Sequence, residues 1–252
     1  IIRPYLESPD PYVKRRAIEC LLRHGDAATR EAALDSFRKM VNDSRVEGEK
    51  NRIEAARLAG EVNDPAFSTH LSRLIREDQS YRVVHAAMAA AGTGKYPGVV
   101  RDVVFRLGGK LTKAGAREAL IQYGESAVKE LRTALFDSRT PRDIRLNIPR
   151  TLSKIHSQSA MNTLLSGLLE DDGSIRFNSV LALEEMARRF ADLKVDREIV
   201  ENAITSDVML YCRRFAIFSV LFANGGKPSV ERESLLSQAL TDSMERVKQR
   251  VI

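Results

Sequence analysis

A basic residue recurs along this chain at nearly constant intervals, and we call this set the basic column. Successive members lie 38, 30, 31, 32, 31 and 37 residues apart. A self-similar period of about 31 residues is typical of helical repeats, whose units bury their apolar faces only by stacking on one another. The column consists of Lys14, Arg52, Arg82, Lys113, Arg145, Arg176 and Arg213.

Two further columns follow the basic one, and their spacing places them on one face of a helix. Three residues after each basic position the chain carries mostly small residues, namely Ala17, Ala55, His85, Ala116, Ile148, Ser179 and Ala216. Seven residues after it come Leu21, Ala59, Ala89, Leu120, Leu152, Leu183 and Val220. Because no polar side chain occupies the last column, we expect it to form a core stripe shared by the repeats.

The clearest unit runs from Asp172 to Phe190, where Asp172 is the expected N-cap and Arg176 follows in the first turn. This pattern of an acid, an apolar-basic pair and then small and apolar residues resembles the HEAT-repeat family, in particular its short bacterial, bilin-lyase-type repeat. The matching sets are Asp10/Val13/Lys14/Ala17/Leu21, Asp172/Ile175/Arg176/Leu183 and Cys212/Arg213/Ala216/Val220.

The resemblance implies an all-α fold, a right-handed α-α superhelical solenoid of about seven helical hairpins that forms one domain over residues 1–252. It implies little chemistry, because a repeat architecture hosts many functions. Each hairpin is expected to pair an inner helix, which carries the basic column, with an outer helix. The expected inner helices cover 11–24, 50–62, 79–91, 111–123, 172–190 and 208–223, and one more begins at 141 and contains Pro149. The expected outer helices cover 27–41, 97–107, 125–136, 157–169, 195–204 and 229–240, and one more begins at 65.

Composition agrees with a helical core. Hydrophobic residues make up 43% of the chain and aromatic residues only 6%, without Trp, which favours helices built on Ala, Leu, Val and Ile over sheets. No run approaches the roughly 18 apolar residues of a membrane-spanning helix, so we expect no membrane insertion by this segment. The N-terminus lacks a signal-peptide profile, and we therefore predict a cytoplasmic location.

No constellation of catalytic or metal-binding residues stands out. The four histidines are isolated in sequence, and none is followed by Glu, whereas the HEAT-like deoxyhypusine hydroxylases would place iron on His-Glu pairs. The stretch Gly92–Gly98 lacks the residues of a phosphate-binding loop and is expected to be a turn that ends a helix. We therefore predict no catalytic, cofactor-binding or metal-binding residue and no enzyme activity, and we expect His85 to be a packed, hydrogen-bonded residue.

Two hypotheses can explain the basic column. Loop acids precede it at Asp10, Asp78, Asp137, Asp172 and Asp207, so it is expected to form a ladder of structural ion pairs. Alternatively, with a net charge of +6, the column could line a groove for nucleic acid, as in the HEAT-like DNA glycosylases. A further alternative is an enzyme similar to the bilin lyases, which are built from the same short repeat.

Both ends of the chain lie within helical patterns and suggest an excerpt of a longer protein. The stretches 232–240 and 244–247 resemble the HEAT-like segments that follow the membrane domain of bacterial ATP/ADP-translocase-type transporters. We therefore expect a non-catalytic scaffold or regulatory module. If it is part of such a transporter, we expect it at the cytoplasmic face of the inner membrane. Its partner is expected to be a protein or another domain of its own chain, without a cofactor.

Overall fold

The computed structural model describes residues 1–223 and residue 242. The chain divides into two compact units, residues 1–160 and 161–252, and each is described by itself. That residues 1–252 form one domain therefore stays a prediction. The expected outer helix over 229–240 and the transporter-like stretches of the tail lie outside the described residues.

All secondary-structure elements in the described residues of both units are helices. Unit 1 contains, in order, η1 (Arg3–Glu7), α1 (Pro11–His24), α2 (Ala27–Val41), α3 (Glu49–Val62), η2 (Pro65–Phe67), α4 (Ser68–Glu77), α5 (Tyr81–Gly94), η3 (Pro97–Val99), α6 (Val100–Phe105), η4 (Arg106–Gly108), α7 (Lys113–Tyr123), α8 (Glu125–Phe136) and α9 (Arg142–Leu152). Helix α10 (Gln158–Gly167) spans the boundary, and unit 2 continues with α11 (Gly173–Arg189) and α12 (Arg197–Ala223).

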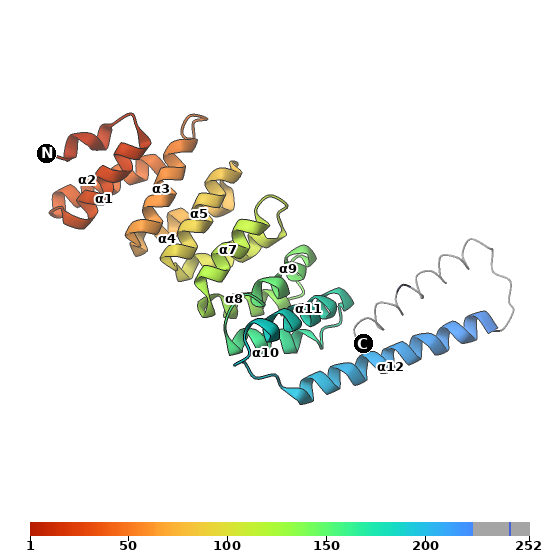
Figure 1. The fold of residues 1–252 in the computed structure, drawn as a ribbon. Coiled ribbons are helices and arrows are strands. Elements are labelled where there is room, and N and C mark those ends of the chain that lie inside the picture. Colours follow the sequence, from red (N-terminus) through yellow and green to blue (C-terminus); the bar gives the residue numbers. More distant parts are fainter. Residues whose placement is uncertain (224–241, 243–252) are drawn as a thin grey trace. The chain divides into compact units, whose positions relative to one another are not determined.

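The helices of unit 1 form two layers. The first layer consists of five helices that pack on one another in succession, namely α1, α3, α5, α7 and α9. Figure 1 shows them side by side in this order, from red to green. The second layer holds α2, α4, α6 and α8, of which α4, α6 and α8 contact one another in succession. This stacking of helix pairs confirms the all-α solenoid class predicted from the sequence.

Helix ends in unit 1 follow local capping signals. Asp10 and Asp26 cap α1 and α2 by accepting hydrogen bonds from the backbone N–H groups of Tyr12 and Thr29. The predicted bounds of α1, α2 and α8 match those of the structure. In unit 2, Asp172 accepts from the backbone N–H of Ser174 and is the N-cap expected for α11.

The predicted loop between residues 204 and 208 is wrong. One helix, α12, runs through all 27 residues from Arg197 to Ala223, where the sequence predicted an outer and an inner helix. The stretch holds no Gly or Pro that would interrupt the backbone hydrogen bonds, and the Thr205 hydroxyl donates to the carbonyl of Glu201 within the helix. The helix therefore continues past the position at which the repeat period predicted a loop.

The core stripe is also displaced in α5. Ala89, predicted to be buried, is exposed, whereas Ala87 and Ala91 are fully buried, two residues later than the repeat pattern places them. The apolar pair Val83 and Val84 is buried at the start of this helix and sets its rotation. Burial of these larger side chains outweighs the alignment of a single basic residue.

Small residues set the distance between α3, α5 and α7. A Cβ atom on Gly92 would lie 2.9 Å from the Cα atom of Ala119 in α7, so the glycine permits close approach of the helices. Gly92 and Gly94 are buried in the last turn of α5, which ends at Lys95 in the left-handed conformation, with φ at 49°. The expected break at Gly92 is therefore wrong, since α5 continues through Gly94.

Two buried tyrosines join three successive helix pairs. The Tyr96 hydroxyl donates to the carbonyl of Ala59 in α3 at 2.6 Å, and the Tyr123 hydroxyl donates to the carbonyl of Tyr96 at 2.9 Å. Burial raises the pKa of both hydroxyls, so both remain protonated donors. Each buried hydroxyl therefore has a hydrogen-bond partner within the stack.

Replacing Leu152 by Ala should lower the free energy of unfolding by about 2–5 kcal/mol, because Leu152 is fully buried and its truncation leaves a cavity. Leu183, in the same predicted column, is half-buried in unit 2, so Leu183→Ala should cost less. Lys129→Ala, on the exposed side of α8, should cost less than about 0.5 kcal/mol. Urea unfolding measures all three, and equal losses would contradict the assigned register.

The Gly115→Ala substitution should destabilise the chain, although Ala usually favours a helix by about 1 kcal/mol. Its Cβ atom would lie 2.6 Å from Cε1 of His85, whose Nε2 is held 3.0 Å from the carbonyl oxygen of Leu111. In a His85→Ala background the same substitution should become neutral or stabilising. A double-mutant cycle by urea unfolding measures this coupling, and additive effects would show that His85 does not require the glycine.

Candidate interaction surface

Four members of the basic column share one position in their helices. Lys14, Arg52, Arg145 and Arg176 are each the fourth residue of α1, α3, α9 and α11 respectively. In α5 this position is taken by Val84, which is buried. The basic column therefore occupies the same position of the helix in these four repeats but not in the repeat of α5.

Arg52 links three parts of unit 1. Its Nε donates to a carboxylate oxygen of Asp78 at 2.6 Å, and both side chains are largely buried. One of its terminal nitrogens donates to the carbonyl of Asp43, just after α2. Asp78 also accepts from the backbone N–H of Ser80 at the start of α5. Arg52 thus joins the end of the preceding helix pair to the beginning of the following one.

Arg145 and Arg176 make the same backward contact. The Nε of Arg145 donates to the carbonyl of Leu135, in the last turn of α8, at 2.7 Å. Within unit 2, Arg176 donates to the carbonyls of Glu170 and Asp171. Its Nε lies 3.4 Å from a carboxylate oxygen of Asp207, in α12. A cation beside the carbonyl end of a helix offsets the partial negative charge there.

The other column members are placed differently. Arg82 is 68% exposed, and its Nη1 lies 3.8 Å from Glu49. Lys113 is the exposed first residue of α7, and Arg213 is exposed in α12. In the described part of the chain, the side chains of Lys14 and Lys113 have no ion pair or hydrogen bond. The structure therefore divides the column into structural arginines and surface cations.

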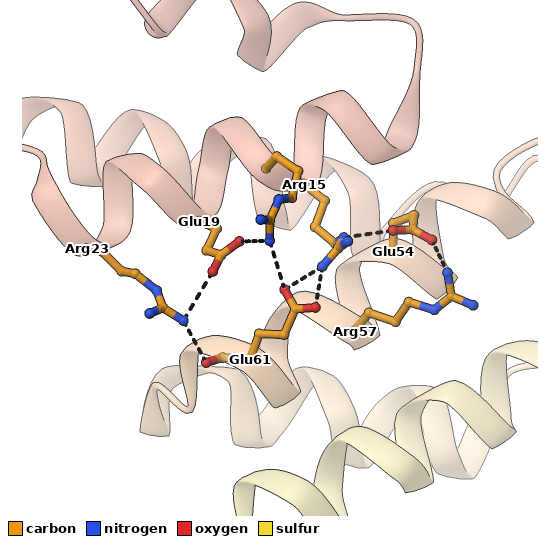
Figure 2. Close-up of polar contacts among 7 residues, drawn as sticks. Arg15, Glu19, Arg23, Glu54, Arg57 and Glu61 are labelled. Atoms are coloured by element: carbon orange, nitrogen blue, oxygen red, sulfur yellow. Dashed lines mark hydrogen bonds and ion pairs between the residues drawn. The ribbon is translucent and has the colours of Figure 1, made fainter.

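A charged network joins α1 and α3, as Figure 2 shows. The Nε of Arg15 lies 2.8 Å from a carboxylate oxygen of Glu54, and the two side chains are only 8% and 11% exposed. Arg15 also contacts both carboxylate oxygens of Glu61, and Arg57 pairs with Glu54 at 2.5 Å. Ion pairs of this burial are costly to leave half-formed, since a lone charge would remain in the interior.

The same network extends to the surface of α1. Arg16 pairs with Glu19 at 2.5 Å, and Arg23 lies 3.1 Å from Glu19 and donates to the carbonyl of Glu61. Two carboxylates on α3 and one on α1 therefore pair with the four arginines at this end of the first layer. This network was not predicted from the sequence, because Arg15 and Glu61 lie 46 residues apart and no periodic pattern marks the pair.

Two arginines of the second layer were also missed. Arg73 in α4 donates to the carbonyl of Val41, at the end of α2, and to the side chain of Asn42. Arg106 in η4 donates to the carbonyl of Ile75, in the last turn of α4, at 2.7 Å. Their spacing, close to one repeat, is the signal that could have identified them.

A groove of about 620 Å³ lies between α3 and α5 on the first layer. Tyr81, 56% exposed, and His85 border it, with Ala89 among its small residues. Arginines and a glutamate of the two helices complete its lining, which consists of Ile53, Arg57, Gly60, Glu61, Tyr81, Arg82, His85, Ala86, Ala89, Ala90 and Thr93. Such a mixture of small, aromatic and charged side chains can receive a peptide.

His85 is half-buried, with its ring edge-on to Tyr81 at 6.5 Å between centroids. Its hydrogen bond to Leu111 agrees with the expected packed histidine. Among the residues that the structure describes, no group of three or more His, Cys, Asp or Glu side chains is arranged to hold a metal ion. None of the described helices combines the length and apolar character needed to cross a bilayer.

Comparisons with known proteins extend the resemblance. Residues 2–92, from η1 into α5, match the family model for HEAT repeats. No curated protein matches this chain. Among solved structures, human deoxyhypusine hydroxylase in complex with glycerol is similar, with 16% identity, a TM-score of 0.32 and coverage of 99% of this chain and 83% of that chain. A TM-score this low supports no inference about activity.

Arg15→Met should lower the free energy of unfolding by about 3–5 kcal/mol, because it leaves Glu54 buried beside a single remaining arginine, Arg57. Arg16→Met removes the same charge from a side chain that is 54% exposed and should cost less than about 1 kcal/mol. Urea unfolding of the two variants measures the difference. Similar losses of unfolding free energy in the two variants would show that the burial of the Arg15–Glu54 pair does not add to its contribution to stability.

Proposed function

We propose that this chain is a non-catalytic protein-interaction module, a scaffold or regulatory element that binds a segment of a protein partner or of another domain of its own chain. The groove between α3 and α5 is the observation that carries the proposal. Its volume of about 620 Å³ accommodates several side chains of an extended segment. HEAT repeats, which residues 2–92 match, commonly serve protein interactions.

The rotation of α5 supports this assignment. Because the buried stripe of α5 lies two residues late, Ala89 faces the groove instead of the core. Small residues at Ala86 and Ala89 leave room between the larger side chains of Tyr81 and Arg57. A partner side chain placed there would be flanked by an aromatic ring and by charged groups, as at the centres of protein interfaces.

The proposal includes a cytoplasmic location, which the sequence prediction alone supports. Attachment to a nucleotide-transporter-like membrane protein likewise depends on the resemblance of residues 232–247 and stays a prediction. An absence of catalysis is part of the same proposal. It is supported by the lack of a nucleophile or acid–base motif in the sequence.

A photo-crosslinking amino acid at Ala89 tests the assignment, with the exposed Ala66 of η2 as the matched control. In cells of the native source, Ala89 should yield one discrete crosslinked protein that Ala66 does not. The purified protein should then bind the chain at least about tenfold more weakly after Ala89→Glu than after Ala66→Glu, because a charge fills the groove. Equal crosslinking, or equal binding by the two variants, would overturn the proposal.

A further inference from the structure

Two arginines on adjacent helices of the first layer lack a counter-charge. The side chain of Arg117 in α7 is half-buried, and its Nε is buried without a hydrogen-bond partner. One terminal nitrogen makes a long contact of 3.4 Å with Oδ1 of Asn147 in α9. One turn further along α9, the exposed side chain of Arg150 has no ion pair or hydrogen bond within the described residues.

The electrostatic situation of this Arg117–Arg150 pair is unfavourable in the unbound chain. The pKa of Arg117 is lowered from its ordinary value, mainly by burial and further by the positive charge of Arg150. At the other end of the first layer the opposite holds, because Arg15 and Arg57 both pair with Glu54 and Arg15 also pairs with Glu61. Carboxylates therefore pair with the arginines of α1 and α3, whereas none pairs with Arg117 or Arg150.

We infer that the Arg117–Arg150 pair binds carboxylate side chains of an acidic segment in the partner protein. This inference rests on the proposed interaction function and names the chemistry of the partner. A carboxylate accepts two hydrogen bonds from the planar fork of a guanidinium, so one or two acidic side chains could supply the absent counter-charges. Neutralisation would also relieve the repulsion between the two arginines.

The neighbouring side chains favour a peptide over a nucleic acid. Exposed carboxylates lie on the same helices, at Glu118 in α7 and Asp143 in α9, and disfavour a long run of phosphates more than one or two acidic side chains placed at the arginines. A nucleic acid also requires a longer run of unneutralised cations, whereas Arg15 and Arg57 at the other end are paired. The few unpaired cations here, Arg117 and Arg150 with Lys113 one turn before Arg117 on α7, suit a short acidic segment.

Fluorescence anisotropy with a labelled hexaglutamate peptide tests the inference, with hexaglutamine as the uncharged probe. The complete chain should bind hexaglutamate and not hexaglutamine. Arg117→Gln and Arg150→Gln should each weaken binding about tenfold, as expected for the loss of a charge-assisted contact. Arg132→Gln, at an exposed position of the second-layer helix α8, should leave binding unchanged. If Arg117→Gln fails to fold, Arg150→Gln at the exposed site decides the question.

Unchanged affinity in Arg150→Gln, or equal binding of the two peptides, would overturn the inference. A single-stranded oligonucleotide of equal charge that binds more tightly, and loses affinity with the same substitutions, would overturn it in favour of nucleic acid. If hexaglutamate fails to bind while Ala89 still captures a partner, the interaction module stands and the acidic partner is rejected. Failure of the crosslinking with binding of hexaglutamate would instead reject the groove and keep the anionic ligand.

Discussion

Successive helices of the first layer approach so closely that several of their contacts leave no space for another carbon atom. A Cβ atom on Gly60 would lie 3.0 Å from the Cα atom of Ala90, and one on Gly92 would be closer still to Ala119. Close approach of this kind fixes how far each helix can rotate, because larger side chains must point away from the contact. The exposed position of Ala89, and with it the groove, follows from that constraint.

Local signals in the sequence predicted most of the helices but not the rotation of each one. The predicted bounds of α2, residues 27–41, match the structure, in which Asp26 caps the first turn by a contact that spans only three residues. Helix α12 was missed because the repeat period was given more weight than the lack of a helix-breaking residue between Arg197 and Ala223. The rotation of α5 depends on which side chains the adjacent helices can bury, and only the folded stack determines that.

The candidate surface was predictable in part. Arg52 could be identified as a structural cation because an acid lies before the next repeat, and the structure places that acid, Asp78, on its guanidinium. The pairing of Arg15 with Glu54, and the lack of an acid beside Arg117, depend on which residues the folding brings together. Composition and net charge carry no information on such pairing, because neutralised and bare arginines count equally in both.

Two hydrogen bonds, from Tyr123 to Tyr96 and from Tyr96 to Ala59, together connect three successive repeats. In a simple stack, each unit exchanges energy only with the units beside it, so opening can begin at any interface and spread in steps. A chain of buried hydrogen bonds that spans α3 to α7 opposes such stepwise opening in the middle of unit 1, since an unmade bond would leave a buried tyrosine hydroxyl without a partner. The middle repeats should therefore open as one cooperative block.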